Sequence, residues 1–279
     1  GIIKGYSAVI VRSATKITGK IIEASDELKF IGRAGSGVDT IDVPAATAKK
    51  VIVMNVPGGN TVSVAEHTLG LMLSMIRFIP QSCADLKNGK WEKKKYMGNE
   101  LYQKKLGIVG LGKIGFEVAK RCKAFEMEVI AYDPALTAEK AKEMGITLVT
   151  LDELLQESDF ISIHTPGGPN TKNLISEKEL AKCKDKVFII NCARGGILSE
   201  DDALKFLNSG KIAGLALDVF SKEPPDSNNA LLCHPNVVVT PHLGASTKEA
   251  QERVGVAIAK QIADALKGKE VVGAVNKLT

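Results

Sequence analysis

Three ionisable side chains, Arg194, Glu223 and His242, each follow the end of a short apolar run in the second half of the sequence. A histidine takes up a proton near neutral pH, and a carboxylate bonded to its ring stabilises the cation and fixes the tautomer. An arginine grips a substrate carboxylate with two hydrogen bonds while it polarises a developing carbonyl. The set predicts oxidation of a secondary alcohol, with His242 as base, Glu223 as its partner and Arg194 as anchor.

A glycine-rich segment indicates what accepts the hydride. Residues 110–115 read GLGKIG, between the apolar run 106–109 and a helical pattern. Gly110, Gly112 and Gly115 would provide a tight turn, room for a pyrophosphate and close helix–strand packing. Asp133 lies 18 residues beyond Gly115, near the spacing of a ribose-binding acid that rejects a 2′-phosphate. The glycine motif, the strand before it, the helix after it and the acid all have the expected spacing. The segment therefore predicts that NAD rather than NADP binds, and it disfavours the alternative of a glycine-rich turn without a ligand.

The elements that must position these residues are short apolar runs separated by helical segments. Capping-box patterns open two of the helical segments, Thr150 with Glu153 and Ser176 with Glu179. Near-continuous apolar runs that alternate with helices predict a doubly wound parallel α/β sheet with both faces covered. The strands expected in this sheet are 106–109, 129–132, 160–164, 187–191, 213–219 and 237–240.

The first part of the chain predicts a second, smaller domain. We expect strands at 8–11, 30–33 and 51–55, and helices at 18–29, at 62–79 with a stop at Pro80, and at 247–267. Residues 57–59, Pro-Gly-Gly, mark a hinge. The predicted domains are therefore 1–57, completed by the C-terminal helix in 247–279, and 58–246 for the nucleotide.

Composition narrows the class of protein. The chain has 279 residues, 44% hydrophobic and 25% charged, with a net charge of +5, and no apolar run long enough for a membrane helix. The five cysteines include no C-x-x-C pair and predict reduced thiols and no metal site. We expect a cytoplasmic enzyme of a small anionic substrate, with neither nucleic acid nor membrane as a partner.

Longer stretches resemble the D-2-hydroxyacid dehydrogenases over the whole chain. The resemblance implies a Rossmann-type nucleotide domain and a smaller, flavodoxin-like substrate domain that lacks its first elements here. It also implies a homodimer or homotetramer assembled through the nucleotide domains. The matching stretches are 11–15, 32–39, 110–115, 191–197, 217–220 with 223–225, and 241–250.

The resemblance also assigns residues. It implies a catalytic role for Arg194, Glu223 and His242, and it places Arg12 and Arg33 beside Arg194 and His242 at the substrate cleft. The alternative for Arg12 and Arg33 is an ordinary surface salt link. Besides the three glycines, the implied NAD contacts are Ser36, Lys113, Ile114, Asp133, Thr165, Cys192, Ala193, Asp218 and Gly244.

A second anionic group on the substrate would need one of the two first-domain arginines. The resemblance implies oxidation of 3-phosphoglycerate at C2 to 3-phosphohydroxypyruvate, with the hydride passing to NAD and the proton to His242. One alternative is another family member, such as a glyoxylate or hydroxypyruvate reductase. The other is an NAD-sensing corepressor scaffold of the C-terminal-binding-protein type.

Three further positions carry expectations. Glu126 stands where relatives have glycine, which costs stability if that position requires a positive φ. His67 is expected to be a packed residue of the helix 62–79, and His164 a neighbour of the cofactor rather than a base.

Overall fold

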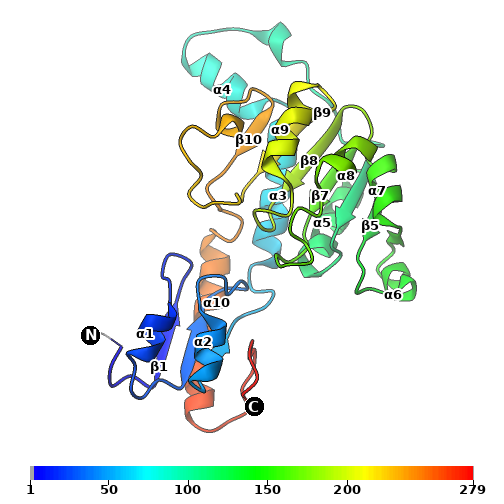
Figure 1. Cartoon of the computed structure of the whole chain (residues 1–279). Coiled ribbons are helices and arrows are strands. Elements are labelled where there is room, and N and C mark those ends of the chain that lie inside the picture. Colours follow the sequence, from blue (N-terminus) through cyan, green and yellow to red (C-terminus); the bar gives the residue numbers. More distant parts are fainter. Residues whose placement is uncertain (1–2, 279) are drawn as a thin grey trace. The chain divides into compact units, whose positions relative to one another are not determined.

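A computed structural model describes residues 3–278 of the chain (Figure 1). The chain forms two units: unit 1 comprises Gly1–Ser63 and Ala245–Thr279, and unit 2 comprises Val64–Gly244. Residues 1, 2 and 279, which belong to the predicted first domain, lie outside the described residues.

Unit 2 is built on a parallel sheet of seven strands in the order β10-β9-β8-β7-β4-β5-β6. This order confirms the predicted doubly wound α/β fold. The short strand β6 was not predicted, because two residues give no readable pattern. The strands are β4 (Lys105–Val109), β5 (Glu128–Tyr132), β6 (Thr147–Leu148), β7 (Phe160–Ile163), β8 (Val187–Asn191), β9 (Ile212–Leu217) and β10 (Val237–Val239).

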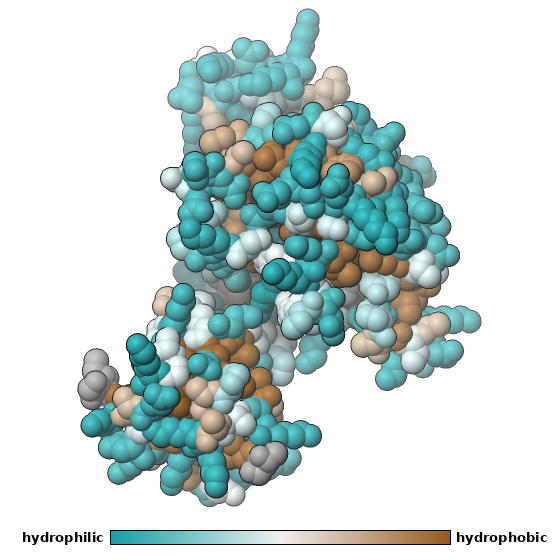
Figure 2. All heavy atoms as spheres, viewed as in Figure 1, coloured by the Kyte–Doolittle hydropathy of each residue, from teal (hydrophilic) through white to brown (hydrophobic). Residues whose placement is uncertain are grey.

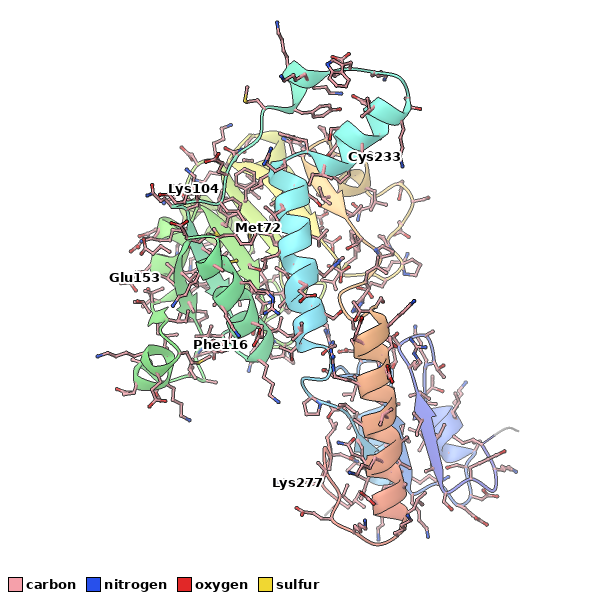
Figure 3. The ribbon with its side chains drawn as sticks, turned by 180° about the vertical axis from the view of Figure 1, so that it is seen from behind. Met72, Lys104, Phe116, Glu153, Cys233 and Lys277 are labelled. Atoms are coloured by element: carbon pink, nitrogen blue, oxygen red, sulfur yellow. The ribbon has the colours of Figure 1, made fainter. Side chains whose placement is uncertain are left out.

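Helices cover both faces of this sheet. Against one face, Met72 of α3 and Val118 of α5 pack with Leu106 and Ile190 of the strands. Figure 3 shows α3, with Met72 labelled, running along the sheet. Leucines of α7, α8 and α9 cover the opposite face. The helices are α3 (Thr61–Ile76), α4 (Ile79–Lys87), α5 (Lys113–Ala124), α6 (Ala138–Glu143), α7 (Leu151–Glu157), α8 (Glu177–Lys182) and α9 (Glu200–Asn208), with the 3₁₀ turns η1 (Lys93–Tyr96) and η2 (Ala230–Leu232).

The predicted stop at Pro80 is wrong. α3 ends at Ile76, Phe78 adopts a left-handed conformation, and Pro80 lies in the first turn of α4. Proline is well tolerated there, because the first N–H groups of a helix have no partner inside it. Among residues 3–278 no single helix is long and apolar enough to cross a membrane, although α3 and α4, bent by 62°, meet the length and composition criteria as a pair.

The capping boxes form as predicted. In α7 the Glu153 N–H donates to the Thr150 hydroxyl oxygen (3.2 Å), and the Thr150 N–H donates to the Glu153 carboxylate (2.8 Å). In α8 the Ser176 N–H donates to Glu179 (3.2 Å). Charged residues occupy the outward side of these helices, and the face drawn in Figure 2 is accordingly mostly hydrophilic over the helices.

Unit 1 joins residues from both ends of the chain. Its parallel sheet has the order β1-β2-β3, formed by Ala8–Val11, Phe30–Arg33 and Ile52–Met54. Helix α10 (Lys248–Leu266) packs its buried apolar residues on this sheet. A Cβ on Gly32 would lie 2.7 Å from Ile258, so glycine allows the close approach.

The remaining elements of unit 1 differ from the prediction or extend it. The helix predicted over 18–29 is only α1 (Gly19–Glu23), and α2 (Val43–Ala48) was not predicted. After α10 the chain adds an antiparallel bridge to β3, in which the Val275 N–H donates to the Val53 carbonyl (2.8 Å). The elements on either side of unit 2 in sequence therefore share one core.

Glu126 lies two residues beyond the end of α5 and has a φ of 60°, so the position does require the positive φ that glycine adopts more easily. Glu126→Gly should raise the free energy of unfolding by about 0.5–1 kcal/mol, because a non-glycine residue pays a steric cost in this region. Chemical denaturation of the two proteins measures the difference. Lys120→Gly, in the interior of the same helix, is the matched control and should lower the stability by about 1 kcal/mol. Equal losses in both variants would contradict the explanation.

Candidate active site

The glycine-rich loop lies where the order of the sheet reverses. Strands β4 and β7 are neighbours, yet the chain continues from β4 to β5 on one side and from β7 to β8 on the other. Ligands of open α/β sheets bind in the crevice at such a point. Gly110 has a φ of 97°, and a Cβ there would lie 2.7 Å from the Thr165 N. The predicted cofactor residues Gly110 and Thr165 thus meet at the carboxyl ends of these two strands.

The other two glycines of the loop, Gly115 and Gly112, differ in the space around them. A Cβ on Gly115 would lie 2.2 Å from the Gly110 carbonyl oxygen, so glycine is needed for α5 to pack on the loop. A Cβ on Gly112 would meet no atom within 4 Å, which leaves space in front of the first turn of α5. Lys113 and Ile114 open that helix. An open space at a helix N-terminus fits a pyrophosphate, so this loop fits NAD.

Asp133, at the end of β5, faces the same loop. Its Oδ2 accepts from the Leu111 N–H and its Oδ1 from the Ala135 N–H, both at 2.9 Å. A carboxylate oxygen accepts more than one hydrogen bond, so ribose hydroxyls can still be accommodated. The acid therefore also holds the glycine-rich loop in place, a role that the sequence did not indicate.

The loop that carries Arg194 is fixed by its own backbone. The buried Asn191 amide donates to the Arg194 carbonyl (2.9 Å), and its oxygen accepts from the Ala193 N–H (3.0 Å). A Cβ on Gly195 would lie 1.9 Å from the Phe220 carbonyl oxygen. The Asn-Cys-Ala-Arg-Gly stretch therefore packs directly against the loop that leads to Glu223.

His242 and Glu223 form the direct contact of the site, with Nδ1 and Oε2 2.8 Å apart. The hydrogen bond that His242 donates to Glu223 is the largest cause that raises the pKa of His242, whereas burial and the charge of Arg194 lower it. Burial works against the charge of Glu223, but bonds from His242 and the Phe220 N–H outweigh it and lower its pKa. Half of the His242 side chain, 48%, remains exposed. The geometry gives an accessible imidazole whose protonated form is stabilised.

A buried carboxylate holds the turn that presents His242. Asp218 is 1% exposed and accepts from the Thr240 hydroxyl (2.5 Å), the Leu243 N–H (2.7 Å) and the Gly244 N–H (2.8 Å). The His242 N–H donates to the Asp218 carbonyl (2.9 Å). His242 has a φ of 54°, a strained conformation for a non-glycine residue. Asp218 therefore stabilises the turn itself, and contacts of Asp218 and Gly244 with the cofactor stay predictions.

Two other residues fall beside the site without acid–base chemistry. Burial lowers the pKa of His164 to about 4, so it is neutral at physiological pH. Burial likewise raises the pKa of Cys192 to about 12, which keeps its thiol protonated. All five cysteines are free. Within residues 3–278 no group of three or more His, Cys, Asp or Glu side chains is placed to hold a metal ion.

His67 lies in α3 and is partly buried, and its ring also makes polar contacts that the sequence did not indicate. Its Nε2 lies 3.2 Å from Asp218 Oδ1 and 3.0 Å from Thr240 Oγ1. These partners are 151 and 173 residues away in the sequence, so no local pattern could reveal the contact.

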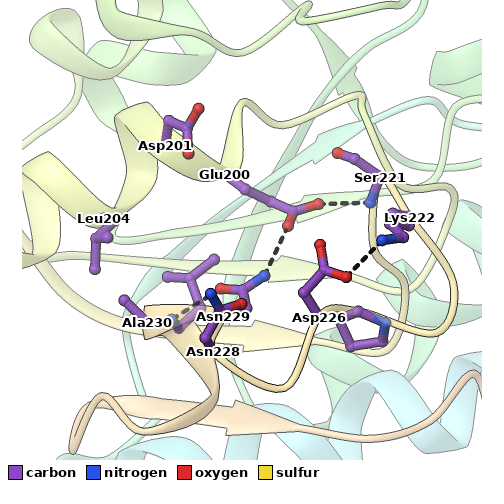
Figure 4. Close-up of a pocket in the computed structure, with 11 residues that line it drawn as sticks. Glu200, Asp201, Leu204, Ser221, Lys222, Asp226, Asn228, Asn229 and Ala230 are labelled. Atoms are coloured by element: carbon purple, nitrogen blue, oxygen red, sulfur yellow. Dashed lines mark hydrogen bonds and ion pairs between the residues drawn. The ribbon is translucent and has the colours of Figure 1, made fainter.

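A cavity of about 330 Å³ lies behind the loop that carries Glu223 (Figure 4). At its wall Glu200 accepts from the Ser221 N–H (2.5 Å) and from the Asn229 amide (3.4 Å). Lys222 pairs with Asp226. Glu200 thereby ties the loop to the start of α9, whereas Lys222 and Asp226 form a pair within the loop.

The remaining predicted residues belong to unit 1. Arg12 follows β1 and Arg33 ends β2, at the carboxyl ends of neighbouring parallel strands. Arg12 is exposed and donates to Gln251 of α10, which in turn donates to the Ala245 carbonyl (2.8 Å). The Ser36 hydroxyl lies 2.8 Å from the Asn60 amide oxygen. The structure thus gathers two cations on one edge of the small sheet.

Comparisons with known proteins identify the family of the chain. The family profile described as "D-isomer specific 2-hydroxyacid dehydrogenase, NAD binding domain" matches residues 69–244. The chain therefore belongs to the D-isomer specific 2-hydroxyacid dehydrogenases, and unit 2 contains their NAD-binding domain. It is 51% identical over 271 residues to the D-3-phosphoglycerate dehydrogenase of Archaeoglobus fulgidus, covering 97% of this chain and 51% of that protein. The chain thus spans about half the length of such curated relatives.

Solved structures give the same family. D-Lactate dehydrogenase from Aquifex aeolicus, complexed with NAD and lactic acid, matches with a TM-score of 0.85 and 31% identity over 96% of this chain and 85% of that one. A glyoxylate reductase from Paecilomyes thermophila matches with a TM-score of 0.88 and 32% identity over 96% and 83%.

The position of Asp133 predicts a change in cofactor preference. Asp133→Ala should narrow the preference for NAD over NADP, because it removes the charge that repels a 2′-phosphate. It should also weaken NAD itself, because the Leu111 N–H loses its acceptor. Fluorescence titration with both reduced cofactors measures the two dissociation constants. An unchanged ratio of the two constants would show that the acid does not face the ribose.

The Glu223–His242 pair predicts a pH dependence. A raised His242 pKa means that the neutral base form appears only at higher pH, so kcat/KM for alcohol oxidation should rise through a pKa above about 6.5. Glu223→Gln removes the main cause of the raised pKa. The acid limb should therefore move to lower pH, while the maximal rate falls because the imidazolium loses its partner. Steady-state rates at a series of pH values measure both. If the acid limb of the pH profile does not move in Glu223→Gln, the limb reports the titration of a group other than His242.

Proposed function

We propose that this chain oxidises 3-phosphoglycerate at C2 to 3-phosphohydroxypyruvate with NAD, the activity of a D-3-phosphoglycerate dehydrogenase and the first step of serine biosynthesis. The contact that carries the proposal is the 2.8 Å pairing of His242 with Glu223, at the sheet edge that also bears Arg194. Identity of about half to curated D-3-phosphoglycerate dehydrogenases supports this substrate over other 2-hydroxy acids.

Each catalytic side chain has one task. The neutral His242 Nε2 takes the proton of the C2 hydroxyl while Nδ1 stays bonded to Glu223, whose charge stabilises the imidazolium as it forms. Arg194 binds the substrate carboxylate and polarises the C2 oxygen as it becomes a carbonyl. NAD, bound at the glycine-rich loop, supplies the acceptor for the C2 hydride.

The substrate phosphate requires cations beyond Arg194. Arg12 and Arg33 stand on one edge of the unit 1 sheet, and Gln251 orients Arg12. We assign the phosphate to these arginines. Unit 1 then acts as the substrate domain and unit 2 as the nucleotide domain.

We also infer that the chain acts in the cytoplasm as a homodimer or homotetramer. Large apolar side chains on the segment after α3 support self-association, because they are exposed in the single chain: Ile79 by 50%, Leu86 by 56%, Trp91 by 81% and Met97 by 84%. Association through this segment would bury them.

A substrate panel tests the proposal. Turnover of 3-phosphoglycerate, glycerate and lactate should be measured with NAD and NADP, and 3-phosphoglycerate with NAD should give the highest kcat/KM. Arg12→Ala should raise the KM for 3-phosphoglycerate by about tenfold or more, the effect of losing a charge-assisted bond, and leave glycerate nearly unchanged. Lys16→Ala, another exposed cation of unit 1, is the matched control.

The variant His242→Asn tests the proposed role of His242 as the base. It should lower kcat by about a hundredfold or more while the NAD affinity stays near wild type. Highest turnover with glyoxylate or hydroxypyruvate would favour a reductase of the same family. No turnover of any 2-hydroxy acid, with NAD still bound, would favour the corepressor scaffold.

A further inference from the structure

His67 is a titratable residue that the proposed mechanism does not use. It projects from α3 with its side chain 23% exposed, and it reaches the carboxylate that supports the His242 turn. α3 is not part of the sheet edge that bears the catalytic residues. The contact therefore connects a covering helix to the active-site turn within unit 2.

The partners of His67 determine which ring nitrogen carries the proton. The Thr240 hydroxyl donates to Asp218 Oδ1, so its oxygen can only accept from His67. The Asp218 carboxylate is an acceptor as well. Both atoms that face His67 Nε2 are acceptors, so Nε2 carries a hydrogen and donates to both.

This donor matters because Asp218 is charged and buried. Burial is the largest influence on the pKa of Asp218 and raises it, but the bonds from His67, Thr240, Leu243 and Gly244 outweigh it and leave the pKa below its ordinary value. Three of these donors belong to the turn that presents His242. His67 alone among the four comes from outside that turn.

We propose that His67 is a positioning residue: its Nε2–H anchors the Asp218 carboxylate and the Thr240 hydroxyl to α3, and through them holds the His242 imidazole against Glu223. The kinetic part of this inference rests on the proposed function, whereas the placement of the His242 ring does not. Without the anchor the strained residue at position 242 relaxes, and its contact with Glu223 weakens.

Two substitutions separate the hydrogen bond from packing. His67→Gln places an amide N–H near the position of the imidazole Nε2, and His67→Leu keeps the bulk without a donor. Glu66→Gln, the preceding and exposed residue of α3, is the control for general changes in the helix. Thr240→Val removes the bridging hydroxyl at nearly constant volume and serves if His67→Leu does not fold.

The first readout is independent of turnover. Nuclear magnetic resonance titration of the His242 ring should give a pKa above the ordinary histidine value in the wild type. The groups that face His242 are Glu223 and Asp218, which raise its pKa, and Arg194, which lowers it. His67→Leu and Thr240→Val should lower this pKa, because the bond to Glu223 weakens, and His67→Gln should restore it.

The second readout is kinetic. His67→Leu should reduce kcat by about 10- to 100-fold, with the dissociation constant of NAD within about threefold of wild type. His67→Gln should recover most of the rate. Equal losses in the Leu and Gln variants, or an unaltered His242 titration in the Leu and Val variants, would overturn the proposal. A wild type that turns over no 2-hydroxy acid, yet shows the predicted titration shifts, would overturn only the proposed function.

Discussion

The candidate site depends on one buried negative charge. Asp218 is enclosed at the end of β9, where a carboxylate is stable only if hydrogen bonds replace its lost water. The turn 240–244 supplies three of those bonds and His67 of α3 supplies another, so the turn takes its shape as it satisfies the carboxylate. The His242 backbone accepts an unfavourable φ because the surrounding bonds over-determine it. The hydrogen bonds to the buried Asp218 carboxylate thereby hold the exposed His242 ring in the position where it can react.

The parallel sheet places this charge and its neighbours. Strands β8, β9 and β10 run in the same direction, so the segments bearing Arg194, Glu223 and His242 leave the sheet at one edge. Backbone contacts then set the distances between these segments, as where Gly195 meets Phe220 without room for a Cβ. Substitution of such a glycine would displace two loops at once, although the glycine has no side chain that takes part in the reaction.

Much of the fold and of the nucleotide loop was predictable from the sequence, because the signals for these features are local or periodic. Apolar runs predicted the strands of unit 2 other than β6 to within a few residues, and Thr150 with Glu153 predicted the start of α7. The glycine spacing predicted the nucleotide loop. Pro80 misled the prediction because proline both ends helices and begins them, and only the left-handed Phe78 distinguishes the two. The contacts of His67 could not be predicted, since its partners Asp218 and Thr240 lie more than 150 residues away in the sequence.

The composition of unit 1 from both ends of the chain has a consequence for biosynthesis. As the polypeptide leaves the ribosome, strands β1 to β3 emerge long before α10, which covers their apolar face. The contiguous residues 64–244 complete their own sheet in the interval. The nascent small sheet must therefore remain uncovered, with Phe30 and Met54 open to water or to a chaperone, until residues 248–266 have been translated.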